Sequence, residues 1–369
     1  MQDFDLKKFE RERLVRKASL ALSTGPRTIT SAVNPRSPGS VHDFSSEADY
    51  WWPDPANPDG PYVQRDGLSN PANFTIHREL MLAFAETVGT LAGACLVTGE
   101  KQYAQAALTH LRAWFVDPAT RMNPDLQYAQ AIQGICTGRG IGVIDTVHLA
   151  EVALAVKALH KNGMFSSEDV VPIAGWFAAY LEWLCTHPYG IEESNWPNNH
   201  GTCWALQASA FAKLTGNARV IADCRRRLTE VILPGQMAVD GSFPQELART
   251  KPYGYSLFNL DVMTSLAQIL SSPTDNLLLY ALADGRSIIR AIEFLAPFLA
   301  DKSSWPYQKD VMCWDEWPIQ QPALLFGALA ANRDDWLEIW KGLNPDPVVL
   351  EVRRNYPIRN AVIWLEASR

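Results

Sequence analysis

Hydrophobic residues recur at three- and four-residue spacings along most of the chain after residue 75. This period predicts helices, each with one apolar face directed to a core. Short breaks such as Thr98-Gly99 and Thr215-Gly216 separate them, which is typical of helix hairpins joined in series. Strand patterns are few, and residues 348–352 are the best candidate. The expected helices cover residues 5–22, 75–99, 101–116, 141–162, 168–186, 200–215, 217–232, 256–271, 277–299, 318–331 and 333–342.

Residues 23–74 are rich in Pro, Gly, Asp and Ser and have no helical period. Irregular segments of this length in compact domains usually serve as lids or binding loops. This one contains Tyr50, Trp51, Trp52 and Arg65. We therefore expect a single all-α domain over residues 1–369, with an irregular lid or binding region at 23–74.

The composition describes a well-packed globular protein, because 47% of its 369 residues are hydrophobic and 20% are charged. A net charge of −7 argues against nucleic-acid binding. An anionic substrate would need a local basic groove, since the whole surface would not attract it. The 13 Trp, 11 Tyr and 14 Phe are compatible with stacking on sugar rings, although a helical core uses the same side chains.

No metal, cofactor or membrane partner is expected from the sequence. The six cysteines are scattered without a CxxC pair, and no HExxH or clustered-carboxylate motif occurs. No apolar run reaches the length of a membrane-spanning helix. Residues 1–22 interleave basic and acidic side chains and lack the apolar core of a signal peptide. The location would be cytoplasmic if Met1 is native, and periplasmic or secreted if a signal peptide has been removed; the oligomeric state is left open.

The candidate chemistry lies in Asn199 and His200, followed later in the chain by Arg249 and Tyr255. These side-chain types suit the removal of a carbon-bound proton beside a carboxylate. An amide and a guanidinium aimed at the carboxylate would spread the charge of the intermediate. Histidine and tyrosine would transfer the protons. We therefore predict Asn199, His200, Arg249 and Tyr255 as catalytic residues of a β-elimination.

Each of these residues also has a purely structural interpretation. Asn199 precedes a helix, where asparagine is a common N-cap, and His200 could be a partly buried histidine. Arg249 could form a surface ion pair with Glu246, and Tyr255 could be a packing residue at a helix start. The catalytic interpretation depends on the four residues together and on the sequence around them.

That surrounding sequence resembles the alginate-lyase superfamily of helical-toroid polysaccharide lyases. The two blocks that hold the candidate residues are NWPNNHGTCW at 195–204 and GSFPQELART at 241–250, which continues to YGYSLFNL at 253–260. Two further blocks lie at 42–55 and 121–140. Four blocks in the expected order are far more specific than an NNH tripeptide alone. The resemblance implies an α/α toroid, an incomplete α/α barrel of helix hairpins.

The same resemblance implies cleavage of a 1,4-linked uronic-acid polymer, which leaves a C4=C5 double bond. Asn199 and Arg249, with His200, would hold the uronate carboxylate. In β-mannuronate or β-glucuronate the C5 proton and the C4 oxygen share one face, so Tyr255 could act as base and then acid. This requires positive charge, such as Arg249, to lower the tyrosine pKa from about 10 toward neutral. For α-guluronate, His200 would be the base and Tyr255 the acid.

Further residues are predicted to line the substrate groove. Tyr128, Gln130 and Arg139 are candidates for contacts to sugar hydroxyls and carboxylates, and the residues of the irregular segment would close over the chain. The full set of predicted substrate-binding residues is Tyr50, Trp51, Trp52, Arg65, Tyr128, Gln130, Arg139, Asn198 and Glu246.

Three alternatives remain open at this stage. Polymannuronate is favoured, but glucuronan differs only at C2 and would suit the same four residues. A glycoside hydrolase on the same toroid would need two carboxylates that flank the bond. Its candidates are Asp145, Glu192, Glu193, Glu246, Asp315 and Glu316. A non-catalytic glycan-binding protein is disfavoured because His200, Arg249 and Tyr255 are all present.

Overall fold

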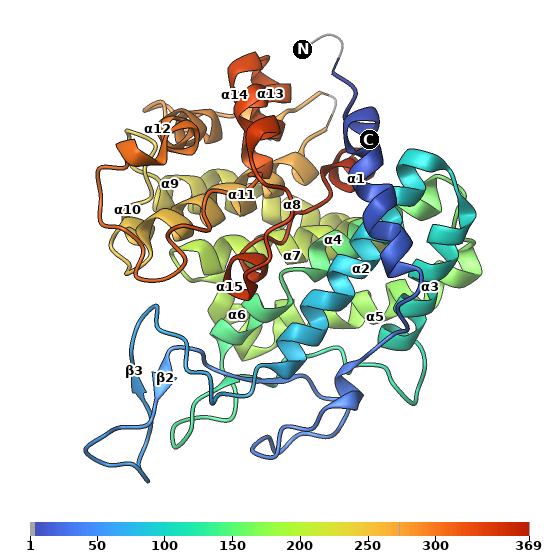
Figure 1. The fold of residues 1–369 in the computed structure, drawn as a ribbon, viewed down its shortest axis with the longest axis vertical. Coiled ribbons are helices and arrows are strands. Elements are labelled where there is room, and N and C mark those ends of the chain that lie inside the picture. Colours follow the sequence, from blue (N-terminus) through green and yellow to red (C-terminus); the bar gives the residue numbers. More distant parts are fainter. Residues whose placement is uncertain (1–3, 273, 369) are drawn as a thin grey trace. The chain divides into compact units, whose positions relative to one another are not determined.

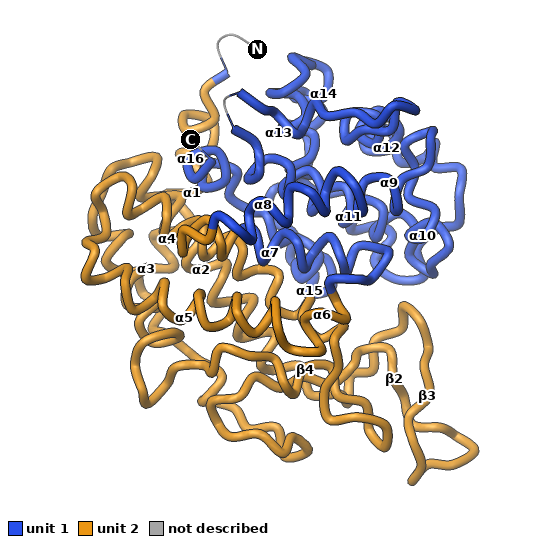
Figure 2. Tube along the Cα trace, turned by 180° about the vertical axis from the view of Figure 1, so that it is seen from behind, with its two compact units in different colours: residues 1–4, 194–209, 218–369 blue, residues 5–193, 210–217 orange. Residues whose placement is uncertain are grey.

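The computed structural model describes residues 4–272 and 274–368, and helices dominate it as predicted (Figure 1). The all-α fold class is confirmed. The chain forms two compact units (Figure 2). Unit 1 comprises residues 1–4, 194–209 and 218–369, and unit 2 comprises residues 5–193 and 210–217. The single domain expected from the sequence stays a prediction.

Unit 2 is built around the long helix α2 (Ile76–Thr98), which packs against α1, α3 and α4. This helix is long and apolar enough to cross a membrane, but 72% of its most apolar window is buried inside the protein, as in a core helix. Gly99 ends it in the left-handed conformation, and its N–H donates to the Cys95 carbonyl at 2.8 Å. The other helices of unit 2 are α1 (Leu6–Ala21), α3 (Lys101–Phe115), α4 (Leu149–Lys161), α5 (Ser167–Thr186) and most of α6 (Pro188–Ser194).

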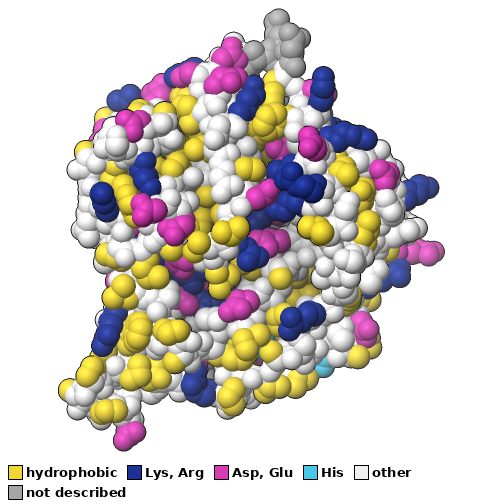
Figure 3. Space-filling view, viewed as in Figure 1, with side chains coloured by type: hydrophobic (Ala, Val, Ile, Leu, Met, Phe, Trp, Pro, Cys, Tyr) yellow, Lys and Arg dark blue, Asp and Glu magenta, His cyan; other side chains and the backbone are white. Residues whose placement is uncertain are grey.

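Segment 23–74 of unit 2 is largely irregular, as predicted, but two short sheets and buried ion pairs hold it in place. Strand β1 (Ser45–Glu47) pairs in parallel with β4 (Tyr128–Ala131), and β2 (Trp51–Trp52) pairs antiparallel with β3 (Val63–Gln64). The Arg78 guanidinium donates to both oxygens of Asp49 at 2.6 Å. Hydrophobic side chains gather at the surface over β2 and β3, with basic side chains at their edge (Figure 3). A single turn of 3₁₀ helix occurs at η1 (Ile29–Ser31), and a longer 3₁₀ helix at η2 (Gly140–Thr146).

Unit 1 is built around α11 (Pro252–Leu270), which packs against α10, α12, α13 and α16. Every residue of α11 except Gln268 is buried, which explains why its sequence is apolar on all sides. The remaining elements of unit 1 are the first part of α7 (Asn199–Thr215), α8 (Ala218–Arg227), the π-helical turn η3 (Leu228–Ile232), α9 (Leu233–Gln236), α10 (Pro244–Leu247), η4 (Leu277–Leu279), α12 (Ile288–Ala300), η5 (Lys302–Ser304), α13 (Pro322–Ala331), α14 (Asp334–Gly342), α15 (Leu350–Arg354) and α16 (Ala361–Ser368).

Three local predictions are wrong. The helix predicted at 141–162 is the 3₁₀ helix η2 up to Thr146, and α4 begins only at Leu149. The predicted strand at 348–352 is instead a loop that leads into helix α15, which begins at Leu350. The predicted helix at 277–299 is a 3₁₀ turn, a loop and then α12. Gly285 turns the loop at a φ of +86°, and the Ser287 hydroxyl accepts the Arg290 N–H to cap α12. Helix α11 also begins four residues earlier than expected, with Pro252 in its first turn.

Candidate active site

The segment before α7 places two of the predicted residues. The Asn198 side-chain oxygen accepts the His200 N–H at 3.1 Å, which is the bond of an N-capping residue. The N-cap role considered for Asn199 therefore belongs to Asn198. Asn199 is 3% exposed, whereas Asn198 and His200 are half-buried.

The side chain of Asn199 is held by Glu246 of α10. The Asn199 backbone N–H donates to Glu246 Oε1 at 2.9 Å, and its Nδ2 donates to Oε2 at 2.8 Å. Glu246 is 1% exposed, so it is not part of the surface ion pair with Arg249 that was considered from the sequence. Burial raises the pKa of Glu246, while the hydrogen bonds from Asn199 and the nearby Arg249 guanidinium act in the opposite direction. Asn199 therefore contacts this buried carboxylate directly, and the Arg249 guanidinium is close enough to lower its pKa.

Gln236, which the sequence analysis did not single out, ties this segment to α11. Its Nε2 donates to the Asn198 carbonyl at 2.7 Å. Its Oε1 accepts from the Thr202 hydroxyl at 2.8 Å and from Asn259 Nδ2 at 3.0 Å. Asn259 lies one helical turn after Tyr255 on α11. The start of α7 is therefore fixed relative to the helix that carries Tyr255.

Tyr255 lies in the first turn of α11 with 8% of its surface exposed. The Arg249 guanidinium lies over its ring, with Cζ 4.5 Å from the ring centroid. The Lys251 ammonium is 5.1 Å from the same centroid. Such cations are attracted to the negative face of an aromatic ring. The structure therefore brings Arg249 and Tyr255 together, as the predicted chemistry requires.

Asp310 fixes the start of α11. Its two carboxylate oxygens accept the N–H groups of Tyr253 and Gly254, each at 2.8 Å. Burial raises the pKa of Asp310, and these bonds oppose the effect. The first turn of α11 would otherwise leave these donors without a helical partner. No motif in the sequence pointed to this residue.

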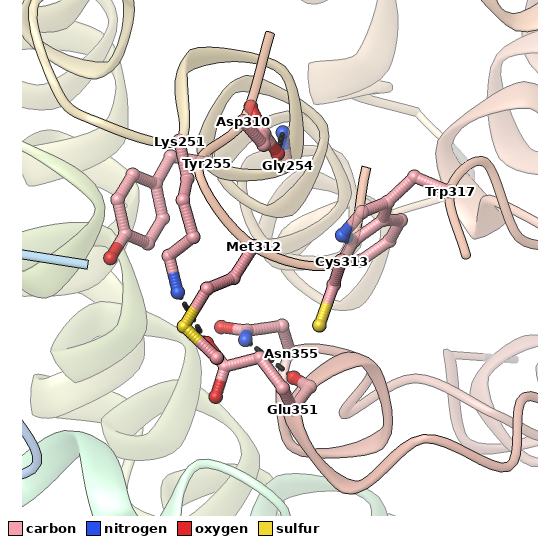
Figure 4. Close-up of a pocket in the computed structure, with 9 residues that line it drawn as sticks. All are labelled: Lys251, Gly254, Tyr255, Asp310, Met312, Cys313, Trp317, Glu351 and Asn355. Atoms are coloured by element: carbon pink, nitrogen blue, oxygen red, sulfur yellow. Dashed lines mark hydrogen bonds and ion pairs between the residues drawn. The ribbon is translucent and has the colours of Figure 1, made fainter. Parts of the chain in front are cut away.

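A pocket opens beside Tyr255 within unit 1 (Figure 4). Its walls come from the first turn of α11, from the loop before α13 and from α15. The lining residues are Lys251, Gly254, Tyr255, Asp310, Met312, Cys313, Trp317, Glu351 and Asn355.

The other predicted binding residues lie in unit 2, where they form two aromatic–cation pairs. Arg139 lies 6.0 Å from the Trp51 ring centroid, and its guanidinium donates to the Gln130 side-chain oxygen at 2.9 Å. Burial lowers the pKa of Arg139. Arg65 lies 5.2 Å from the Trp52 ring centroid. Tyr50 precedes Trp51, and its carbonyl accepts the Arg65 N–H; Tyr128 begins strand β4, which also contains Gln130.

Among the described residues, no group of three or more His, Cys, Asp or Glu side chains is placed to hold a metal ion.

Comparison with known proteins assigns the family. A family model described as alginate lyase matches residues 28–305. This chain belongs to the alginate lyase family. It is a polysaccharide lyase, and its fold class is the α/α toroid of that family. The comparison with curated proteins found no match to this chain.

Solved structures agree with this assignment. An alginate lyase from Bacteroides ovatus is 32% identical, with a TM-score of 0.82 over 97% of this chain and 93% of the other. Alginate lyase A1-III from Sphingomonas species A1 is 16% identical, with a TM-score of 0.58 over 94% of each chain, and supports the fold. Two variants of that enzyme, one with a histidine changed to alanine and one with a tyrosine changed to phenylalanine, are solved with a bound tetrasaccharide; each is 15% identical with a TM-score of 0.56, over 85% of this chain and 84% of the other.

Proposed function

We propose that this alginate lyase cleaves 1,4-linked uronate chains by β-elimination, with polymannuronate as the favoured substrate. The observation that carries the proposal is the contact of Arg249 with Tyr255, together with the two hydrogen bonds that hold Asn199 to the buried Glu246 carboxylate. Solved relatives are named alginate lyases, and two variants of one are complexed with a tetrasaccharide. These relatives support an anionic polysaccharide as the substrate of this chain.

The first role in this mechanism is to bind the uronate carboxylate. Arg249 would supply a charged pair of donors, and Asn199 would supply the amide hydrogen that is not directed to Glu246. Donors fixed in advance in a partly buried site stabilise the negative charge that develops on the carboxylate as the C5 proton leaves. This role accounts for the presence of an amide and a guanidinium together.

The second role is proton transfer at Tyr255. Its phenolate oxygen takes the C5 proton, and the electrons of that C–H bond form the C4=C5 double bond. The C4–O bond breaks, and the leaving oxygen receives the proton from the Tyr255 phenol. Arg249 over the ring favours the phenolate that begins this cycle. For guluronate, His200 would take the proton and Tyr255 would protonate the leaving oxygen.

We assign Glu246 a positioning role in place of the sugar contact predicted from the sequence. Both of its oxygens accept hydrogen bonds from Asn199, and its side chain is buried. A carboxylate in this position also repels a uronate unless cations lie between them. Glu246 therefore acts on the substrate through Asn199.

The two aromatic–cation pairs of unit 2 are proposed as sugar-binding positions. A uronate offers a flat apolar ring face and a carboxylate, which match an aromatic ring with a guanidinium beside it. The pair of Trp51 and Arg139 and the pair of Trp52 and Arg65 each present both groups.

A test of the proposed function offers polymannuronate, polyguluronate and glucuronan separately and follows the ultraviolet absorbance of the conjugated C4=C5 product. We expect the fastest rise with polymannuronate. A rise with glucuronan alone would replace the proposed substrate and keep the mechanism. New reducing ends without unsaturation on any polymer would contradict the elimination and indicate hydrolysis.

A further inference from the structure

Lys251 is a buried lysine that the proposed mechanism does not use. It is 4% exposed, and its ammonium lies 5.1 Å from the centroid of the Tyr255 ring. Figure 4 shows the ammonium between that ring and the Glu351 carboxylate, with which it forms an ion pair. A buried ammonium is costly unless an anion and hydrogen bonds compensate it. Glu351 is the anion that makes this position possible.

Glu351 is itself held in place from α15. Its carboxylate accepts from Arg354 at 2.7 Å, and its carbonyl accepts from Asn355 Nδ2 at 2.8 Å. The side chain of Glu351 is 12% exposed. Helix α15 lies beyond residues 28–305, the part of the chain that the family model matches. A segment outside the matched region thus anchors the lysine beside Tyr255.

A buried ion pair is weak evidence for stability, because well-packed apolar residues often stabilise a core as well or better. The placement of this pair beside the ring is therefore the informative feature. Arg249 and Lys251 provide two cations beside the ring of one tyrosine. Positive charge near a phenol favours its ionised form, and at a buried side chain such as Tyr255 the effect is stronger than in water.

We propose that Lys251, held by Glu351, is a positioning residue that stabilises the phenolate form of Tyr255. The catalytic meaning of this inference rests on the proposed function, but the effect on Tyr255 ionisation does not. In a syn elimination the phenolate is the base, so its stabilisation brings the active form to lower pH. In an anti elimination Tyr255 is the acid, and the same stabilisation makes its proton easier to release to the leaving oxygen.

The experiment measures Tyr255 ionisation directly, by ultraviolet titration of tyrosinate in the full chain. The difference between the titrations of the parent and of Tyr255→Phe isolates this one tyrosine. The same difference is taken in a Lys251→Met background, where the side-chain length is kept and the charge is lost. We expect the midpoint of Tyr255 ionisation to rise by about one pH unit, because the substitution removes one cation at this distance from the ring.

Two further variants separate charge from packing. Lys251→Arg keeps the positive charge and should hold the midpoint near that of the parent. Lys309→Met removes a surface lysine that lies beside a different ring, 5.5 Å from the Trp314 centroid, and should leave Tyr255 unchanged. If Lys251→Met does not fold, Lys251→Gln takes its place in the same titration.

An unchanged midpoint in a folded Lys251→Met or Lys251→Gln protein would overturn the inference, as would an equal rise in Lys251→Arg. The titration needs no substrate, so a shifted midpoint in a protein without lyase activity would refute the proposed function alone. In an active enzyme, the limb of the kcat/KM profile that Tyr255 controls should move to higher pH by the same amount. A fall in kcat/KM at every pH without that movement would indicate a merely structural lysine.

Discussion

The two oxygens of the Glu246 carboxylate accept the backbone N–H and the side-chain amide of Asn199, at 2.9 and 2.8 Å. This pairing joins the start of α7 to α10. It also fixes the orientation of the Asn199 side chain, whose NH₂ group faces the Glu246 carboxylate. The same pairing places a buried carboxyl group close to the Arg249 guanidinium. The role that we propose for Glu246 is therefore to position Asn199.

Glu246→Gln should lower both turnover and stability. The new amide would direct its own N–H₂ group at one of the two Asn199 donors, which leaves a buried donor unsatisfied. We expect a loss of about 1–3 kcal/mol in the free energy of unfolding and a fall in kcat/KM of roughly 100-fold through misplacement of Asn199. Urea unfolding and initial rates measure the two effects. The exposed neighbour Gln245→Ala is the control, and an active Glu246→Gln enzyme would remove the positioning role.

Asn198 and Asn199 should differ in what their substitution changes. Asn198→Ala removes the cap of α7 and should cost about 1 kcal/mol of stability, which Asn198→Ser should largely restore. Asn199→Ala should lower kcat/KM more strongly, because it removes a donor to the uronate carboxylate. Thermal unfolding and initial rates of both variants make the comparison. Equal loss of activity in both would show that they act as one unit.

Asp310→Ala should weaken the first turn of α11. Two backbone donors lose their acceptor, so we expect a loss of about 0.5–2 kcal/mol of stability. Because that turn carries Tyr255, kcat should fall more than substrate affinity. Asp310→Asn keeps one acceptor oxygen and should have an intermediate effect. Full activity in a folded Asp310→Ala protein would show that Tyr255 is positioned without this cap.

Asp261, buried in the middle of α11, should make the free energy of unfolding depend on pH. Burial raises its pKa well above the ordinary value, and its hydrogen bond from the Ala323 N–H opposes this only in part. A carboxyl whose pKa is higher in the folded state binds more protons when folded. Its contribution to stability is complete below the unfolded pKa and is lost as the pH rises toward the folded pKa.

Relative to Asp261→Asn, the parent should therefore lose stability as the pH rises from the ordinary aspartate pKa of about 4 toward the raised pKa of the folded state. Urea unfolding of both proteins across that range measures the difference. The exposed Asp315→Asn is the matched control and should follow the parent. A difference between parent and Asp261→Asn that does not change with pH would contradict the raised pKa.

The sequence predicted most helices because their apolar period is strong, and α2, α3 and α5 begin within a residue of the expected positions. It failed at residues 348–352, where a run of β-branched residues favours a strand but a packed single turn of helix forms. It failed at 277–299 because Gly285 and Ser287 break a pattern whose apolar residues continue on both sides.

The candidate site was predictable only where residues close together in the chain carry the chemistry. Asn199, His200, Arg249 and Tyr255 have side chains whose types indicate their function, and sequence similarity around them strengthened the prediction. Gln236, Asp310 and Glu351 act through contacts with distant segments, and a single sequence does not show such pairings. Asn198 and Asn199 have the same side chain, so only the geometry distinguishes the cap from the donor.

In the proposed mechanism Tyr255 transfers the protons of the elimination. The initial rate of C4=C5 formation from polymannuronate by Tyr255→Phe tests this role, with Tyr253→Phe as the matched control. Tyr253 lies two residues away, and its hydroxyl donates to the Phe298 carbonyl at 2.8 Å. We predict that Tyr255→Phe lowers the rate by about 10²- to 10⁴-fold while Tyr253→Phe stays near the parent. A Tyr255→Phe enzyme that forms unsaturated product at the parent rate would contradict the account.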